Sequence, residues 1–246
     1  MRQRLDQYLV ASGRYATRSR AADAVRRGCI AVNGEVATRL SMPVVETDRI
    51  ETADFGRAYV SRAALKLKAG LEASGYCPAG RIALDLGAST GGFTQLLLEE
   101  GAAKVWAVDV GHGQMHPAVR ADARVRLLEG VNARDLAGKM LDGERPQFLV
   151  ADLSFISLRL ALPPALQLAV PGAKGIFLVK PQFELGPDAI GKGGLVRDES
   201  AARQCADEMS VWLSGEPGWR AEGVVASPIA GGSGNREWLL YGFREE

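Results

Sequence analysis

The chain has 246 residues, of which 47% are hydrophobic and 24% are charged, as in a globular protein with one large domain or a large and a small one. It contains no apolar run near the ~18 residues that a membrane-spanning helix needs, and its first residues, MRQRLDQYLVASG, lack the apolar core of a signal peptide. We therefore expect a soluble, cytoplasmic protein. Its three cysteines are widely spaced, so we expect no disulfide framework.

The net charge is distributed unevenly along the chain. Residues 1–50 hold nine arginines and five acidic residues, a net charge of +4, whereas the whole chain carries +1. The remaining residues therefore carry a net charge of −3. A basic segment ahead of a mildly acidic body indicates that this segment contacts a polyanion. An unevenly charged, solvated surface is the alternative.

The first fifty residues predict a small α+β unit. Apolar residues recur at helical spacing from Leu5 to Leu9, and Thr17 can cap a second helix. The pair Asn33-Gly34, between two short apolar runs, predicts a hairpin with a type I′ turn. Arginines can project from the helical faces that the core does not use, and their guanidinium groups bind phosphate bidentately. The arginines that we assign to RNA binding are Arg4, Arg14, Arg18, Arg20, Arg26, Arg27 and, farther along the chain, Arg62.

The order RLD…L…G…SR..A…V..G.I.VNG resembles a small RNA-binding module shared by a ribosomal small-subunit protein, many pseudouridine synthases and tyrosyl-tRNA synthetases. The resemblance covers residues 3–50. It implies a small RNA-binding domain at residues 1–56, a linker at 57–60 and a second domain at 61–246.

The segment RIALDLGASTGGFTQLLLEEGAAKVWAVDVGHGQ predicts a strand, a glycine loop, a helix and a second strand. The first strand runs from Ile82 to Leu86, and the glycines after it let the backbone approach a ligand at the start of a helix. The second strand ends in Asp109, whose carboxylate suits the two hydroxyls of a ribose. The pattern predicts a Rossmann-like α/β sheet that binds a nucleotide-containing cofactor.

Two cofactors compete for this architecture. A dinucleotide site requires G-x-G-x-x-G, but Ser89 stands where the second glycine belongs, and Asp85 immediately precedes the loop. An acidic residue there suits S-adenosylmethionine, which carries an ammonium group and a sulfonium, and DLGASTGGF resembles the first motif of Rossmann-like methyltransferases. Asn132, expected at the end of a third strand, can read the adenine edge. The predicted cofactor-binding residues are Asp85, Gly87, Ser89, Gly91, Gly92, Phe93, Asp109, Asn132 and Asp152.

The fourth predicted strand, QFLVADLSFISL, ends at Asp152. Methyltransferases that act on base amines usually carry an acid or asparagine followed by two prolines and an aromatic residue there, whereas this chain has Leu153-Ser154-Phe155. Enzymes that methylate pyrimidine carbon use a cysteine close to this strand, and none of the three cysteines lies near it in sequence. The motif therefore argues against both kinds of base methylation.

Lys180 follows the fifth predicted strand, at the edge where the carboxyl ends of parallel strands line a ligand crevice, so Lys180 and Asp152 should both face the methyl donor. Lys66 belongs to a helix before the first strand, with Lys68 as the alternative if that helix is rotated. Glu237 belongs to the last predicted strand. Two lysines, an aspartate and a glutamate in this order resemble the catalytic set of FtsJ-type ribose 2′-O-methyltransferases.

A ribose hydroxyl is a poor nucleophile, and its proton has to leave as the methyl group arrives. A free lysine, with a pKa of ~10.4, is protonated at neutral pH, although desolvation and a neighbouring cation lower the pKa of a lysine. We hypothesise that Lys180 is the general base or the main orienter of the hydroxyl, with Asp152 and Glu237 orienting the two ammonium groups. A strand-end lysine that merely extends to water is the alternative.

Over nearly all 246 residues, the motifs GASTGGFT, DVGHGQ, ADLSFISL, VKPQFE and ASPIAGGSGNREW resemble the TlyA family. The resemblance implies 2′-O-methylation of a cytidine in ribosomal RNA with S-adenosylmethionine. Family members act on large-subunit RNA, and some also act on the small subunit. The partner implied is ribosomal RNA or a ribosomal subunit, and the substrate is free RNA, a subunit or the whole ribosome.

Two other readings remain. Members of this family are often called haemolysins, but the sequence has neither a spanning segment nor a strongly amphipathic basic helix to support membrane lysis. The second alternative is an assembly factor that binds RNA or the ribosome and has no catalytic activity. The intact donor loop and the four catalytic candidates argue against it. His112 and His116 are spaced as a metal pair on a helix, but no third ligand lies nearby in sequence, so we expect no metal.

Overall fold

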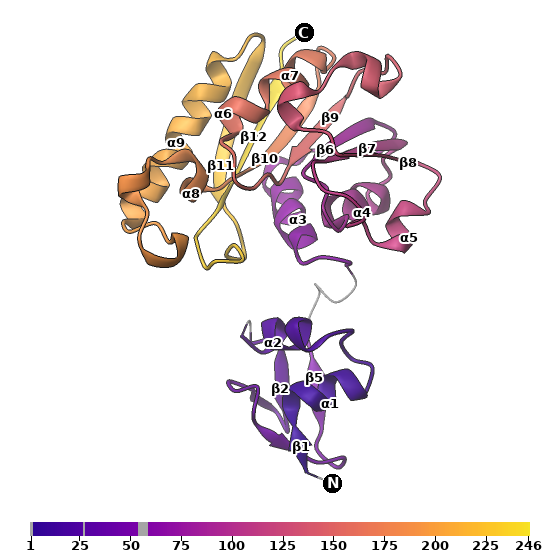
Figure 1. Cartoon of the computed structure of the whole chain (residues 1–246), viewed down its shortest axis with the longest axis vertical. Helices are drawn as coiled ribbons and strands as arrows, with labels where there is room; N and C mark the ends of the chain where they lie inside the picture. Colours follow the sequence, from indigo (N-terminus) through magenta and orange to yellow (C-terminus); the bar gives the residue numbers. More distant parts are fainter. Residues whose placement is uncertain (1, 27, 54–58) are drawn as a thin grey trace. The chain divides into compact units, whose positions relative to one another are not determined.

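The structure is a computed structural model that describes residues 2–26, 28–53 and 59–246 (Figure 1). The chain divides into two compact units, Met1–Ala58 and Tyr59–Glu246. Residues 57 and 58 of the predicted linker lie outside the described residues, as does Arg27. The site described below belongs wholly to the second unit.

The N-terminal unit combines two helices with two small sheets. Strand β2 lies between β3 and β5 in an antiparallel sheet, while β1 pairs with β4. Leu5 and Leu9 from the first helix and Ala24 and Val25 from the second are buried in one core, as their helical spacing predicts. The elements are β1 Gln3–Arg4, α1 Leu5–Ala11, α2 Arg18–Arg26, β2 Ile30–Val32, β3 Glu35–Val36, β4 Pro43–Val44 and β5 Ile50–Thr52.

Two local predictions for this unit are confirmed. The hydroxyl of Thr17 accepts a hydrogen bond from the backbone N–H of Arg20 at 3.3 Å, which caps the second helix. Asn33 and Gly34 have φ values of 53° and 86° and connect β2 to β3, as a type I′ turn requires.

The C-terminal unit is built on a seven-stranded sheet, ordered β11-β12-β10-β9-β6-β7-β8. Strands β10, β9, β6, β7 and β8 are parallel, while β12 runs antiparallel to both of its neighbours. The predicted Rossmann-like sheet and its first strand are confirmed. The strands are β6 Ile82–Leu86, β7 Lys104–Asp109, β8 Val125–Glu129, β9 Phe148–Ala151, β10 Lys174–Val179, β11 Trp219–Ala226 and β12 Trp238–Arg244.

Helices cover both faces of this sheet (Figure 1). Alternate residues of β6 enter different cores, since Leu84 and Leu86 pack with the α6, α7 and α9 side, whereas Ala83 packs with the α3 and α4 side. The α-helices are α3 Ala63–Ser74, α4 Gly92–Glu99, α5 Pro117–Arg120, α6 Leu158–Ala161, α7 Pro163–Leu168, α8 Pro181–Glu184 and α9 Glu199–Gly215. The 3₁₀ helices are η2 Ala133–Asp135, η3 Gly138–Leu141, η4 Pro187–Ala189 and η5 Lys192–Gly194.

The strand order reverses between β6 and β9. From β6 the chain moves outward to β7 and β8, and then returns to place β9 on the other side of β6. In open α/β sheets, ligands bind outside the carboxyl ends of the strands at such a reversal. Gly87 follows β6 and Asp152 follows β9, so both residues stand at this point.

Candidate active site

A tight glycine turn opens the site after β6. Gly87 has a φ of 80°, and a Cβ atom placed there would lie 2.5 Å from the backbone oxygen of Asp152. Any larger residue would therefore need both an unfavourable backbone conformation and a displaced β9 loop. The requirement explains why the sequence has glycine at this position.

Asp109 organises the loops on one side of the turn. Its carboxylate accepts hydrogen bonds from the backbone N–H groups of Ser89, at 2.8 Å, and Gly111, at 2.7 Å. The Ser89 hydroxyl in turn donates to Gln114 Oε1 at 3.1 Å. The acid at the end of β7 is thus held at the rim of a cavity, where the sequence predicts a ribose-binding carboxylate.

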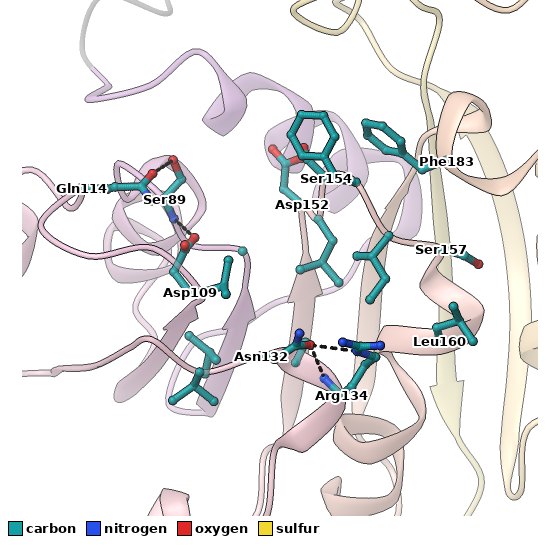
Figure 2. A pocket seen from close by; sticks show the side chains of 18 residues that line it. Ser89, Asp109, Gln114, Asn132, Arg134, Asp152, Ser154, Ser157, Leu160 and Phe183 are labelled. Carbon is teal, nitrogen blue, oxygen red and sulfur yellow. Dashed lines mark hydrogen bonds between the residues drawn. The ribbon is translucent and has the colours of Figure 1, made fainter. Parts of the chain in front are cut away.

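This cavity has a volume of about 1050 Å³ and lies outside the ends of β6, β7 and β9. Figure 2 shows Ser89, Asp109 and Gln114 on one side, Phe183 and Leu160 on the other, and Asp152 between them. The predicted cofactor residues that line it are Gly87, Ser89, Asp109, Asn132 and Asp152. Its size and its mixture of apolar and polar groups suit a nucleoside-containing ligand.

A smaller cavity of about 190 Å³ adjoins the first, because Gly87, Ser89, Asp152 and Ser154 line both. All four predicted catalytic residues line this smaller cavity, together with Gly92 and Phe93 of the predicted cofactor set. The predicted catalytic residues are Lys66, Asp152, Lys180 and Glu237.

The two lysines are held by separate acids. Lys180 Nζ lies 2.6 Å from Asp152 Oδ1 and donates a hydrogen bond to Ser154 Oγ at 2.9 Å. Lys66 Nζ donates to Glu237 Oε2 at 2.5 Å. Lys66, Lys180 and Glu237 are buried, with 7%, 8% and 2% of their surfaces exposed. A charged lysine is stable in a protein interior only beside an opposite charge, so each carboxylate stabilises the ammonium group of its own lysine.

The helix rotation that the sequence left open is now defined. Lys66 lies on the buried face of α3 and lines the smaller cavity, whereas Lys68 is exposed. Lys66, rather than the alternative Lys68, is therefore the lysine of α3 that lines this cavity.

Asp85 behaves differently from the other predicted cofactor residues, because it is fully buried and lines neither cavity. Its Oδ2 accepts a hydrogen bond from the Thr94 hydroxyl at 2.6 Å, while its Oδ1 has no hydrogen-bond partner among the described residues. Burial, helped by the nearby charges of Asp152 and Asp109, raises the pKa of Asp85 to about 7. Gly91 also lies outside both linings, where it precedes α4 with a φ of 92°.

Two of the predicted positions differ in detail from the structure. Glu237 stands one residue before β12 rather than on it, and Asn132 follows β8 by three residues instead of ending it. Asn132 caps η2, since its Oδ1 accepts the backbone N–H of Arg134 at 3.1 Å. In both cases the side chain still lines a cavity, from the loop after β8 for Asn132 and from the loop before β12 for Glu237.

Sequence reasoning missed three groups at the site. Ser154 contacts Lys180, and Glu184 accepts hydrogen bonds from the Ser157 hydroxyl and the Leu158 N–H, which joins the loop after β9 to α8. Burial raises the pKa of the Glu184 carboxyl. Phe155 is 91% exposed beside the larger cavity, with a φ of 64°. The motif ADLSFISL contains Ser154 and Phe155, but it does not give the direction of their side chains.

The arginines assigned to RNA binding lie in both units, Arg62 next to α3 and the others in the N-terminal unit. Arg4 and Arg18 both pair with the buried Asp6, at 3.0 Å and 2.6 Å, while 49% and 60% of their side chains stay exposed. Their guanidinium groups are therefore fixed on one side and accessible on the other.

The sequence predicts no metal site, because His112 and His116 have no third ligand nearby in the chain. His116 uses its Nδ1 to accept the backbone N–H of Ala118, which caps α5. Within residues 2–26, 28–53 and 59–246, no group of three or more His, Cys, Asp or Glu side chains is placed to hold a metal ion.

Comparison with known proteins assigns both units to families. Residues 59–244 match the FtsJ-like methyltransferase model, and residues 3–50 match the S4 domain. A Mycobacterium tuberculosis protein described as the 16S/23S rRNA (cytidine-2'-O)-methyltransferase TlyA is 43% identical over 98% of this chain and 89% of its own length.

Two further relatives carry a different name. Hemolysin A of Brachyspira hyodysenteriae is 37% identical over 97% of this chain and 98% of its own length. A solved structure from Streptococcus thermophilus, described as a candidate hemolysin, has a TM-score of 0.77 at 34% identity and covers 100% of this chain and 89% of that one. Among the described helices of the present chain, none has the length and apolar character needed to cross a membrane.

Proposed function

Because this chain belongs to the FtsJ-like methyltransferase family, and to the TlyA branch that joins such a domain to an S4 domain, we propose that it transfers a methyl group from S-adenosylmethionine to a cytidine 2′-hydroxyl in ribosomal RNA. One observation carries the proposal. Two buried lysines, each paired with a carboxylate, line one small cavity beside a nucleoside-sized cavity, and the pairs are Lys66–Glu237 and Lys180–Asp152.

The residues of the larger cavity fit S-adenosylmethionine. Asp109 would offer a carboxylate to a ribose diol, Asn132 an amide to an adenine edge, and Asp152 an anion to a cationic group of the donor. Gly87 lines this cavity without a side chain, so its backbone is open to a ligand. When bound, S-adenosylmethionine supplies a methyl group on a cationic sulfur, which is a good leaving group without acid catalysis.

The small cavity would hold the ribose hydroxyl. Lys180 is fixed by Asp152 and Ser154 on two sides, which leaves its amine able to meet a third group in the cavity. We assign to Lys180 the orientation of the hydroxyl and the removal of its proton as the carbon–oxygen bond forms.

Lys66 and Glu237 would complete the cavity without taking the proton. Lys66 adds a cation that favours developing negative charge on the attacking oxygen, and Glu237 holds that cation in place. Positioning would also lower the activation barrier, because holding a nucleophile in line with the methyl group is worth up to ~7–11 kcal/mol in favourable cases.

Recognition of RNA would be divided between the units. The exposed arginines of the S4 domain can bind phosphates, which positions the RNA without reading its sequence. Phe155 offers an exposed ring at the edge of the larger cavity, and its ring lies 5.2 Å from that of Phe183. A base taken out of its stack could lie against this ring while its ribose enters the small cavity. A ribosomal substrate places the protein in the cytoplasm.

The test incubates the protein with S-adenosylmethionine labelled in the methyl group and with separated ribosomal subunits from cells lacking this activity. The RNA is digested and the labelled nucleoside is identified. Label on the 2′-oxygen of cytidine supports the proposal and names the subunit. Label on a base would contradict the ribose mechanism, and absence of label, with donor binding confirmed, would favour an inert assembly factor.

A further inference from the structure

Asn235 is a buried polar residue that the proposed chemistry does not use. Only 4% of its surface is exposed. Its Oδ1 accepts the backbone N–H of Val196 at 2.9 Å, and its Nδ2 donates to the backbone oxygen of Gly194 at 2.7 Å and to Ser233 Oγ at 3.2 Å. Since the first partner is a donor and the second is an acceptor, the orientation of the amide is determined.

The partners of Asn235 belong to a hairpin on the surface. Ile190 and Val196 form an antiparallel bridge, the N–H of Gly191 donates to the oxygen of Leu195 at 2.7 Å, and the N–H of Arg197 donates to the oxygen of Ala189 at 3.0 Å. These bonds keep residues 189–197 folded as a unit, which we call the outer hairpin. Asn235 attaches this unit to the loop before β12.

That loop in turn encloses the carboxylate of Glu237. The N–H of Gly231 donates to the oxygen of Asn235 at 2.9 Å, and the N–H of Gly234 donates to the oxygen of Gly231 at 3.0 Å, which closes a tight turn. A Cβ atom placed on Gly231 would collide with Glu237 Oε1. The turn therefore packs directly against the side chain that holds Lys66.

We propose that Asn235 is a positioning residue, which docks the outer hairpin on the 231–235 turn and thereby holds the Glu237 carboxylate against Lys66. The inference rests on the proposed function for its effect on methyl transfer, but the contact that it explains is independent of the reaction. Without the amide, Gly194 and Val196 would lose buried hydrogen-bond partners, and the turn would lose its support.

A second connection, from the same loop to the start of α9, provides a matched control. Arg236 forms an ion pair with Glu199 at the start of α9, and most of both side chains is exposed. Surface ion pairs of this kind contribute little. Loss of Arg236 should therefore leave Glu237 in place, although it is the direct neighbour of both Asn235 and Glu237 in the chain.

The decisive variant is Asn235→Asp, which keeps the shape and the acceptor for Val196 but places a second oxygen against the oxygen of Gly194. It is compared with Arg236→Gln, Glu237→Gln and the double variant Asn235→Asp/Glu237→Gln. For each protein we would measure the affinities for S-adenosylmethionine and ribosomal RNA and the single-turnover rate of methyl transfer. In protein carrying ¹⁵N-lysine, the side-chain signals of Lys66 and Lys180, assigned with Lys66→Arg and Lys180→Arg, report each ion pair without any reaction.

We expect Asn235→Asp to lower the single-turnover rate at least about tenfold, with both affinities within about threefold of the original protein. The double variant should be no slower than Glu237→Gln, because both changes disturb the same contact. The Lys66 signal should shift in Asn235→Asp and stay unchanged in Arg236→Gln, while the Lys180 signal stays unchanged in both.

The inference is overturned if the Lys66 signal is unaffected by Asn235→Asp, if the two rate losses multiply, or if affinity for S-adenosylmethionine falls as much as the rate. If the parent protein methylates no RNA, the proposed function fails, and the Lys66 signal still decides the role of Asn235. Should Asn235→Asp not fold, Val196→Pro is the second variant, because it removes the backbone N–H that donates to Asn235 Oδ1. The preceding residue, Leu195, has a ψ of 135°, which tolerates a following proline. The same shift of the Lys66 signal is then expected.

Discussion

Each unit of the molecule buries an aspartate, and the two units treat it in opposite ways. Asp6 in the N-terminal unit is 3% exposed, and hydrogen bonds from the Arg4 and Arg18 guanidinium groups lower its pKa to about 2. Asp85 in the C-terminal unit is fully buried with one hydroxyl partner, and desolvation raises its pKa to about 7. Burial alone therefore does not set the direction, because the charges that face the carboxylate decide it.

The difference extends to the cations of each unit. In the N-terminal unit, guanidinium groups stay half exposed above a buried acid, which suits contacts with a solvated polyanion. In the C-terminal unit, Lys66 and Lys180 are buried against Glu237 and Asp152, where they can act on a group that has left water. The four predictions below change one side of this comparison at a time.

Removing a buried cation should have the largest effect. Lys180→Ala should reduce the single-turnover rate of methyl transfer by about 10²–10⁴-fold, because it removes the group assigned to the hydroxyl proton. Affinity for S-adenosylmethionine, measured by calorimetry, should change little. Lys68→Ala, an exposed lysine on the same helix as Lys66, is the control and should keep full activity. Equal losses in rate and donor affinity would assign Lys180 a structural role.

Removing arginines of the N-terminal unit should weaken RNA binding without changing the chemistry. The combined change Arg14→Gln, Arg18→Gln and Arg26→Gln should lower affinity for ribosomal RNA by about 10- to 100-fold at moderate salt and reduce the salt dependence of binding. The rate at saturating RNA should be retained, which separates this variant from Lys180→Ala. A triple change of exposed arginines in the C-terminal unit that line neither cavity, at 126, 203 and 220, is the charge-matched control. An equal effect of the two triple variants would remove the special role of the S4 domain.

Asp85 should make the C-terminal unit less stable as the pH rises. A carboxyl with a raised pKa in the folded state favours folding while it is protonated, so its contribution is complete below the unfolded pKa of 3.8 and is lost as the pH rises through about 7. Asp85→Asn should weaken this dependence, with a change on the order of 1–3 kcal/mol between pH 5 and pH 8. Calorimetric unfolding at both pH values checks it, and an unchanged difference would contradict the assignment.

Asp6 should show the smallest effect and the opposite sign. Its lowered pKa stabilises the folded state above the unfolded value of 3.8, and this stabilisation is lost as the pH falls through about 2. Asp6→Asn should cost about 1 kcal/mol at pH 7, since the two arginines are half exposed and screened by solvent. The stability difference between parent and variant should shrink below pH ~4, which acid titration followed by circular dichroism measures. A constant difference would mean that packing, rather than charge, accounts for the loss.

Much of the fold followed from local patterns. Thr17, Asn33 and Gly34 act within a few residues of their own positions, so their cap and turn can be read from neighbouring letters. The strand Ile82–Leu86 was also predictable, since five residues bounded by a glycine loop leave few alternatives. Strand ends then indicated which side chains face the ligand, because parallel strands present their carboxyl ends at one edge.

Patterns were weaker where a strand meets a loop. Asn132 and Glu237 both lie outside the strands to which their spacing assigned them, because the hydrogen-bonded ladder ends where the loop begins to turn toward the cavity. Asp85 was predicted to serve the cofactor from its place before the glycine loop. In the structure its side chain is fully buried and accepts a hydrogen bond from Thr94 of α4, on one of the two faces between which the side chains of β6 alternate.

The sequence by itself determined the two-unit plan, the Rossmann-like sheet, the glycine loop and the residue types of the site, because these depend on hydrophobic period, turn chemistry and motif order. Only the tertiary structure decided which lysine meets which acid. Lys66 and Glu237 are 171 residues apart in the chain and 2.5 Å apart at their charged atoms. It also decided that Ser154 contacts Lys180 and that Asn235 supports Glu237, since buried polar groups must find partners among whatever segments the folded chain brings together.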